Sequence, residues 1–219
     1  MILALDTSSA ALSCALFDSA VVAESLLRER HGEALPGALL ELCARAGKSL
    51  DDVTGLAVGL GPGSFTGLRV GLAAAKALAY ARRLPIAGVS SLRALARAFA
   101  APGRIVVPTL EARKGELYAA AFRGDEQLWP AAAMRGPRFI ELMRTLPDPL
   151  IVGPGAAALG LASVADPPPA RIVAELCAPL LAGARYDQAA CFALQPDYVK
   201  PSEAEVALAE GRVGWLPGR

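Results

Sequence analysis

The segment from Gly55 to Arg83 constrains the fold of this chain more than any other part. An apolar run over residues 55–60 is followed by the loop Gly-Pro-Gly-Ser-Phe-Thr-Gly at 61–67 and then by an alanine-rich stretch. A short apolar run bounded by glycines predicts a buried strand, and the alanine-rich stretch predicts a helix. The sequence therefore predicts a strand, a glycine loop and a helix in succession, which is typical of α/β proteins.

The rest of the chain alternates apolar runs with turn residues and helical spacings. The predicted strands are 2–5, 12–17, 21–27, 55–60, 85–89, 104–110, 116–122 and 150–152, and the predicted helices are 33–46, 67–83, 91–100, 137–146 and 172–182. The stretch around Trp129 is predicted to be irregular, and the prolines at 167–169 predict a loop. The break Ala-Pro-Gly at 101–103 predicts two domains, 1–102 and 103–219.

The charge balance argues against a chain that holds nucleic acid unaided. Twenty-two basic and 21 acidic residues give a formal charge of +1, whereas nucleic-acid-binding domains are usually strongly basic. The four cysteines form no C-x-x-C pair, which favours reduced, buried thiols. The chain has neither a basic leader nor a run of about 18 apolar residues. We therefore expect a cytoplasmic protein that is neither exported nor membrane-spanning.

The loop at 61–67 and the end of the first strand form the first candidate site. Backbone N–H groups between a strand and a helix suit an anion such as phosphate, and a carboxylate at Asp6 would reach Mg²⁺ or a water nearby. The candidate residues near an anion or nucleotide are Asp6, Gly61, Gly63, Ser64, Thr66 and Gly67. The loop is not a Walker A motif, because Leu-Arg follows its last glycine. The alternative is structural: the glycines permit close packing, a hydroxyl caps the helix, and Asp6 serves a turn.

The helix predicted over 67–83 is the second candidate site. Arg69, Lys76, Tyr80 and Arg83 fall within about 60° on a helical wheel, and most other positions are small or apolar. Such a helix has one side for its own sheet and another that can approach a second helix closely. From the residues alone, a partner surface and a contact with the helix at 33–46 are equally well supported.

Two further features bear on chemistry. The charged run at 111–116 lies between two predicted strands, which favours a hairpin over the edge of a ligand site. His31 is the only histidine, which excludes a two-histidine metal site and a Ser-His-Asp triad with a histidine to spare. We expect His31 to be a solvated residue, and we predict no metal site.

Several motifs occur in an order and spacing that match a known family. They are Ile-Leu-Ala-Leu-Asp-Thr-Ser at 2–8, His31, Gly-Pro-Gly-Ser-Phe-Thr-Gly-Leu-Arg at 61–69, Gly-Val-Ser-Ser-Leu at 88–92, Glu-Ala-Arg-Lys-Gly-Glu-Leu-Tyr at 111–118 and Pro-Asp-Tyr-Val at 196–199. In these motifs the chain resembles the TsaB (YeaZ) family. The run at 61–69 is the most specific of them, residues 123–190 match only loosely, and Glu111 stands where many relatives have Asp.

The resemblance implies an α/β fold of two actin-like (ASKHA, ribonuclease H-like) domains, each a mixed sheet flanked by helices. It implies a role in making N6-threonylcarbamoyladenosine (t6A) at position 37 of tRNAs that read codons starting with A. A TsaB-type chain is not the transferase; it pairs with the catalytic TsaD-type subunit, or with itself as a homodimer, and a TsaE-type ATPase joins. The resemblance thus implies no catalytic residue and no tightly bound cofactor in this chain. The complex uses ATP and Mg²⁺ and reaches tRNA as a whole.

The resemblance also implies where the partner binds. Family members pack their two N-domain helices against the equivalent helices of the partner, which here are 33–46 and 67–83. The predicted interface residues are Leu35, Leu39, Leu42, Arg69, Val70, Ala74, Ala77 and Leu78.

Two other functions compete with the scaffold role. An actin-like, Mg-ATP-dependent ATPase or small-molecule kinase would use Asp6 and the loop at 61–67 around the nucleotide. A peptidase has the least support, because no nucleophile–base pair is recognisable.

Overall fold

A computed structural model describes residues 1–28, 31–113, 115–161, 163–164 and 166–199. The uncertain tail at 206–219 and Lys114 of the charged run lie outside the described residues, as does the side chain of His31. In chain order the elements are β1 (Ile2–Asp6), β2 (Leu12–Asp18), β3 (Ala20–Leu27), α1 (His31–Arg45), a 3₁₀ turn (Leu50–Asp52), β4 (Gly55–Gly59), α2 (Phe65–Arg82), β5 (Ile86–Val89), α3 (Ser91–Ala98), β6 (Ile105–Glu111), β7 (Glu116–Arg123), β8 (Glu126–Arg135), α4 (Gly136–Met143), β9 (Leu150–Val152), α5 (Pro154–Ala158), α6 (Ala170–Leu181) and α7 (Gln188–Ala193).

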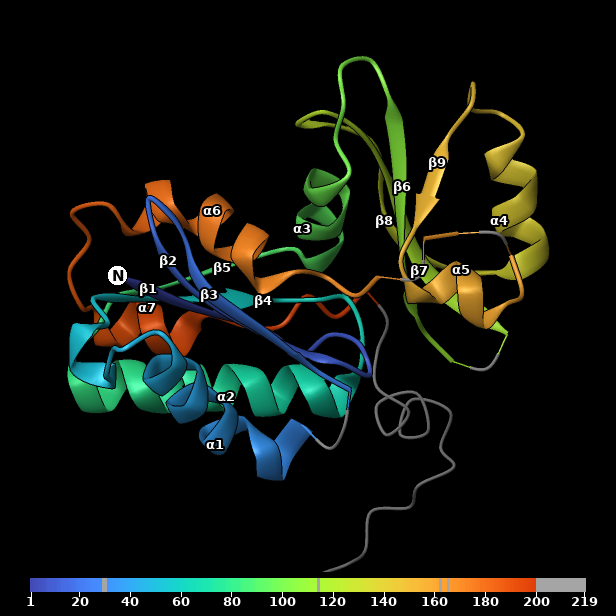
Figure 1. The fold of residues 1–219 in the computed structure, drawn as a ribbon. Coiled ribbons are helices and arrows are strands. Elements are labelled where there is room, and N and C mark those ends of the chain that lie inside the picture. The colour runs from blue at the N-terminus through green and yellow to red at the C-terminus, as the bar shows by residue number, and fades with distance from the viewer. Residues whose placement is uncertain (29–30, 114, 162, 165, 200–219) are drawn as a thin grey trace, which may run out of the picture.

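Two mixed sheets organise these elements into two lobes (Figure 1). The first sheet has the order β3-β2-β1-β4-β5, with β1 antiparallel to β2 and parallel to β4. The second has the order β8-β7-β6-β9, again with antiparallel neighbours on one side of β6 and a parallel neighbour on the other. The repeated pattern confirms the expected α/β fold of two actin-like units, each a mixed sheet with flanking helices.

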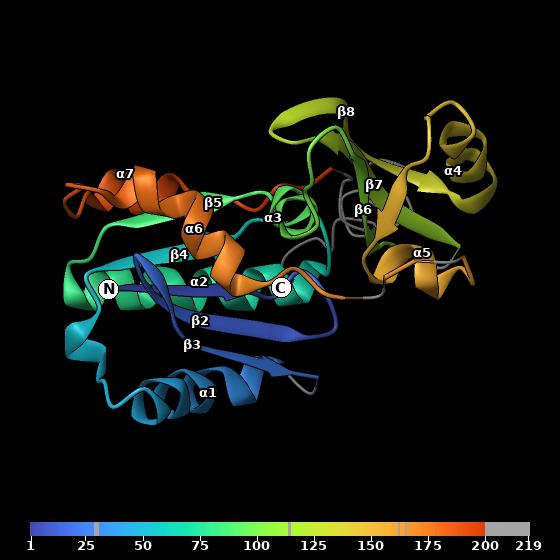
Figure 2. The ribbon, with the colours of Figure 1, turned by 45° about the horizontal axis from the view of Figure 1, so that its top comes forward.

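The first sheet is covered on both faces because its strands alternate large and small side chains. Leucines such as Leu3 and Leu5 point to the face packed by α1 and α2, whereas Ala4, Ala15 and Ala57 point to the face packed by α6. Small side chains let α6 approach the sheet closely. Figures 1 and 2 show α6 on one side of this sheet and α1 with α2 on the other.

The second sheet is also covered on both faces, but one of its helices comes from the chain before the sheet. Helix α3 buries Leu92 and Leu95 against β6 and β7, and α4 and α5 bury Phe139 and Ala156 on the opposite face. Helix α3 begins beside the first sheet, where Ser91 bonds to the loop after β4. It therefore connects the two lobes.

The last helices return to the first lobe. Helix α6 packs on β1, β2, β4 and β5, and α7 packs beside α2. The break at residues 101–103 lies between the last strand of the first sheet and the first strand of the second, and two helices from the second predicted domain, 103–219, pack in the first lobe. The apolar side of α6 packs on the alanine face of the first sheet. The local sequence of α6 predicts a helix but does not show which sheet it covers.

Most predicted elements are confirmed, including the antiparallel meander at the start and the hairpin that joins β6 and β7 around residues 111–116. The irregular stretch predicted around Trp129 is wrong, because residues 126–135 form the edge strand β8. Helices α5 and α7 were not predicted. All four cysteines are free and buried, as expected. Within the described part of the chain, no helix combines the length and apolar character needed to cross a bilayer.

Candidate functional site

Asp6, at the end of β1, is the centre of a buried hydrogen-bond network. Its side chain is only 1% exposed. The Ser8 backbone N–H and Ser8 Oγ donate to Asp6 Oδ1 at 2.9 and 2.6 Å, and Ser91 Oγ donates to Oδ2 at 2.6 Å. Ser91 Oγ in turn accepts a bond from the N–H of Gly61 at 3.0 Å. The carboxylate thus joins β1, the glycine loop and the start of α3.

The buried environment of Asp6 disfavours the ionised form of its carboxyl group. Burial raises the pKa of Asp6 above its ordinary value of 3.8, and the hydrogen bonds from Ser8 and Ser91 oppose part of that rise. Gly59 lies against the carboxylate so closely that a Cβ there would overlap Asp6 Oδ2. Both carboxylate oxygens are therefore occupied by protein groups, and the side chain is sealed from solvent.

The glycines of the loop at 61–67 allow it to pack against the segment that follows β1. A Cβ on Gly63 would overlap the carbonyl of Ser8, and one on Gly67 would overlap the carbonyl of Thr7. A glycine of α2 repeats the pattern, because a Cβ on Gly71 would meet Thr7 Oγ1. These positions need glycine for close approach of two backbone segments.

Several N–H groups of the same loop are used inside the protein. Ser64 caps α2 by accepting from the N–H of Gly67 at 3.2 Å, and the N–H of Ser64 donates to the Ser8 carbonyl at 2.7 Å. The N–H of Gly61 is bonded to Ser91. Thr66 is exposed on the first turn of α2. Three N–H groups of the loop, those of Gly61, Ser64 and Gly67, are thus used inside the protein, and Asp6 has no oxygen free to hold Mg²⁺-nucleotide.

Three of the predicted interface residues lie inside the core. Leu35, Leu39 and Leu42 on α1 are 1%, 8% and 1% exposed and pack on the strands of the first sheet. Their side chains pack in the core of this chain, and their predicted contact with a partner stays a prediction. They are buried because α1 uses its one continuous apolar stripe to cover its own sheet.

Some of the predicted interface residues on α2 are half-buried, and the others are exposed. Val70, Ala74 and Leu78 are half-buried against the core shared with α1. Arg69 is exposed, with its guanidinium 4.0 Å from the ring centre of Phe65, and Ala77 is exposed.

The basic stripe noted on α2 faces the C-terminal segment. Arg69 Nε donates to Tyr198 Oη at 3.1 Å, and Lys76 Nζ donates to the Phe192 carbonyl at 2.9 Å. The rings of Tyr80 and Phe192 lie 5.9 Å apart. This side of α2 is therefore partly covered by the chain's own α7 and by the residues that follow it.

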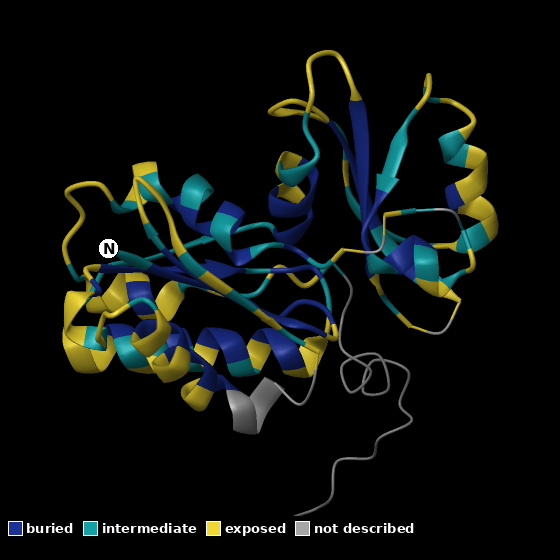
Figure 3. Ribbon diagram, viewed as in Figure 1, coloured by how far each residue is buried: buried dark blue, intermediate teal, exposed yellow. Residues whose placement is uncertain are grey.

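What remains open is a ridge of small side chains along α2 and an exposed leucine on α1. Thr66, Ala73 and Ala77 are exposed on α2, and Leu40 on α1 is 58% exposed; Figure 3 shows the exposed positions of both helices. We call these four residues the outer ridge. The sequence analysis did not single out Leu40. Its position outside the apolar stripe of Leu35, Leu39 and Leu42 could have indicated that its side chain is exposed.

Comparison with known proteins decides the family. The family model of TsaD, tRNA N6-adenosine threonylcarbamoyltransferase, matches residues 22–163, more than half of the chain. The tRNA threonylcarbamoyladenosine biosynthesis protein TsaB of Escherichia coli K12 is 38% identical over 133 residues, which cover 58% of this chain and 58% of that relative. TsaB of Bacillus subtilis 168 is 28% identical over 237 residues, covering 96% and 99% of the two chains. The solved structure of YeaZ from Pseudomonas aeruginosa superposes with a TM-score of 0.72 at 25% identity, covering 90% of this chain and 98% of that one.

The chain belongs to the TsaB (YeaZ) family. Its relatives are tRNA t6A biosynthesis proteins, and the match to the TsaD model shows that the TsaB-type chain is also related to that transferase. The two candidate sites of this chain differ in their exposure. The Asp6 network is internal, whereas the outer ridge is open to a partner.

Proposed function

We propose that this chain is the non-catalytic scaffold subunit for threonylcarbamoyl transfer to adenosine 37 of tRNAs that read codons starting with A. It dimerises with a TsaD-type catalytic subunit, the pair recruits a TsaE-type ATPase, and the chain forms a homodimer when alone. ATP and Mg²⁺ are used by the complex, and this chain binds no cofactor tightly. Family membership and the names of the relatives support the pathway.

The enclosed state of Asp6 carries the non-catalytic part of the proposal. A carboxylate that orients Mg²⁺ for phosphoryl transfer needs an oxygen free for the metal. Here both oxygens accept bonds from Ser8 and Ser91, and the side chain is 1% exposed. The network supports a role for Asp6 in holding the glycine loop and α3 in place.

The outer ridge supports the partner-binding part. Two helices approach most closely where their side chains are small, because the interaxial distance depends on the residues in contact. Ala73 and Ala77 provide such a strip, and the exposed Leu40 on α1 offers an apolar side chain to a partner. The half-buried Val70, Ala74 and Leu78 lie next to the strip and would complete the contact.

The deciding experiment is t6A formation on tRNA by a TsaD-type subunit with a TsaE-type ATPase, ATP and threonylcarbamoyl-adenylate, with and without this chain. We expect modification to depend on the chain and the chain alone to form no product. Turnover of Mg-ATP by the isolated chain, with no effect on t6A formation, would favour the ATPase or kinase alternative instead.

Ala77→Glu tests the partner surface in the same assay. A buried charge at a helix–helix contact should reduce t6A formation about tenfold or more and abolish co-elution with the TsaD-type subunit. The matched control is Ala189→Glu, an exposed alanine on α7, the helix that contacts the basic stripe of α2. Wild-type activity of Ala77→Glu would contradict the interface. Circular dichroism checks that both variants remain folded.

A further inference from the structure

Strand β3 is an open edge of the first sheet. It pairs with β2 only, so one side of its eight-residue backbone faces away from the sheet. Among the described residues, no hydrogen bond is recorded on that outer side. Leu26, which pairs with Ser13 on the α6 face, is 45% exposed, and Val22 is 42% exposed. An edge of this kind is a template for an added strand.

The other long edge strand carries more protection than β3. Strand β8 contains Pro130, has a charged residue at each end, and pairs with β7 through two register shifts. Prolines, charges and bulges are the usual means of blocking an edge. Strand β3 has no proline, a single charged residue, Glu24, and one register shift against β2. The β3 edge is therefore less blocked than the β8 edge.

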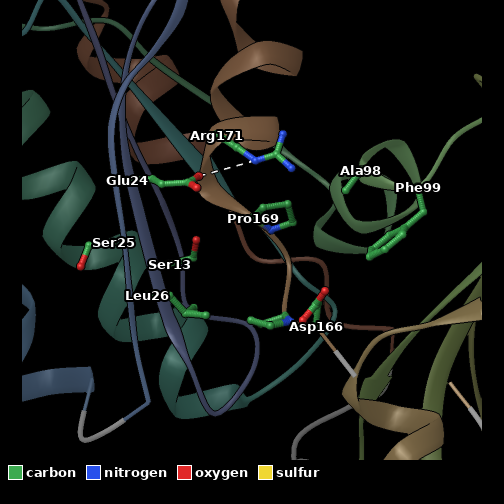
Figure 4. A pocket seen from close by; sticks show the side chains of 10 residues that line it. Ser13, Glu24, Ser25, Leu26, Ala98, Phe99, Asp166, Pro169 and Arg171 are labelled. Atoms are coloured by element: carbon green, nitrogen blue, oxygen red, sulfur yellow. Dashed lines mark ion pairs between the residues drawn. The ribbon is translucent and has the colours of Figure 1, made fainter. Parts of the chain in front are cut away.

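A cavity of about 530 Å³ adjoins this edge. It is formed by the α6 face of β2 and β3, the C-terminal end of α3 and the proline loop that leads into α6 (Figure 4). Leu26, Phe99, Pro167 and Pro169 provide apolar walls. Its size is within the range of pockets that hold one large side chain or a small molecule.

The charges around the cavity favour a cation. Arg171 Nε lies 3.5 Å from Glu24 Oε2, so these two side chains pair with each other, as the dashed line in Figure 4 shows. Asp166 also lines the cavity and is exposed, and it makes no ion pair within the described part of the chain. Two carboxylates and one guanidinium leave a net negative charge beside the apolar walls.

We propose that the β3 edge and this cavity together bind an extended peptide segment of a partner protein. The peptide backbone adds a strand to β3, and a basic side chain of the peptide enters the cavity, where its stem packs on Phe99 and its charge meets Asp166. In strand addition the backbone bonds provide affinity and a neighbouring pocket provides specificity. This site uses the α6 face of the sheet, whereas the outer ridge belongs to α1 and α2 on the opposite side, so it is independent of the scaffold interface.

The test uses the full chain and a labelled probe peptide, Val-Thr-Val-Arg-Val-Thr-Val, in fluorescence anisotropy and in amide hydrogen exchange. We expect saturable binding with slower exchange of the β3 amides. Asp166→Lys should weaken binding about fivefold, and a probe with Glu in place of Arg should recover that loss on the same variant. Asp166 is exposed in a loop, so this variant should fold, and its thermal unfolding provides the check.

A probe N-methylated on alternate residues separates strand addition from simple charge attraction. The methyl groups remove backbone donors, and binding should be lost even though the arginine remains. Binding that survives methylation, or that ignores the charge swap at Asp166, would overturn the proposal. So would loss of self-association in Val22→Lys but not in Ala77→Glu, because β3 would then be a contact between copies of this chain.

Discussion

Asp6 on β1 and Thr109 on β6 occupy the same position in their sheets but differ in chemistry. In the first sheet Leu5 pairs with Val58, and Asp6 and Gly59 follow; in the second, Pro108 pairs with Val152, and Thr109 and Gly153 follow. Both polar residues are buried, Asp6 at 1% and Thr109 at 0% exposure. Both glycines allow a close approach to the polar residue opposite.

The difference lies in charge. Thr109 Oγ1 donates to the Val152 carbonyl at 2.9 Å and accepts from the N–H of Ala156 at 3.0 Å, so it ties β6 to β9 and α5 with neutral groups. Asp6 ties three segments together and keeps a carboxylate away from water. The comparison teaches that one junction can be closed by a hydroxyl, whereas the junction that anchors both the glycine loop and α3 uses a stronger, charge-assisted acceptor.

Alanine substitutions of Gly153 and Gly59 should show the largest difference in the free energy of unfolding. Gly153→Ala places a Cβ against the Thr109 backbone carbonyl and requires a side chain at φ +97, so we expect a loss of about 4 kcal/mol in the free energy of unfolding. Gly59→Ala meets the Asp6 side chain, which can shift in part, and should cost about 2 kcal/mol. Urea denaturation measures both.

The control for these glycine variants is Gly103→Ala. Its φ is +72, but no heavy atom lies within 4 Å of the added Cβ, so only the backbone strain of about 1 kcal/mol remains. If all three variants lose equal stability, the close approach at the strand ends has no energetic importance.

Removing the partners of the polar residues should produce the next largest effects. Ser91→Ala takes one donor from the Asp6 carboxylate and leaves the Gly61 N–H without its acceptor, at a cost of about 2 kcal/mol near neutral pH. Thr109→Val keeps the shape of the side chain and should cost about 1 kcal/mol. The Ser91→Ala cost should shrink in acid, because a protonated Asp6 needs that donor less, while the Thr109→Val cost should not change. Equal pH profiles would contradict the role of charge in the first junction.

The smallest effect is expected for Asp6→Asn, and it depends on pH. Burial raises the pKa of Asp6 above 3.8 in the folded state. As pH rises above that value, the unfolded chain loses the proton first, so the contribution of this group to stability falls until the pH passes the folded-state pKa. Asp6→Asn has no such titration. Its stability relative to wild type should therefore increase with pH over that window and stay within about 1 kcal/mol. A decrease would show that the hydrogen bonds outweigh the burial.

Local patterns predicted most elements but could not decide how distant segments meet. The run at 55–83 is a strand, loop and helix as expected. Whether its glycines face an anion or a neighbouring backbone depends on Thr7 and Ser8, which are far away in the sequence. Strand β8 was missed because Pro130 argues against a strand, although an edge position tolerates proline.

For the candidate interface too, the sequence predicted the apolar and basic sides of the helices but not the segments that cover them. Helical spacing identified the apolar stripe of α1 but not its partner, and the sheet of the same chain takes that stripe. On α2, spacing separated the basic stripe from the small residues correctly. It could not show that Phe192 and Tyr198 come back from the end of the described chain to lie on the basic stripe.

The return of α6 to the first sheet sets an order for biosynthesis. A nascent chain released up to residue 102 contains every strand of the first sheet but not the helix that covers Ala4, Ala15 and Ala57. That alanine surface remains exposed to solvent until α6 has been synthesised, and α6 follows every strand of the second sheet in the chain. The lobe that is synthesised first is thus completed last, and a stop codon before β9 would leave both lobes unfinished.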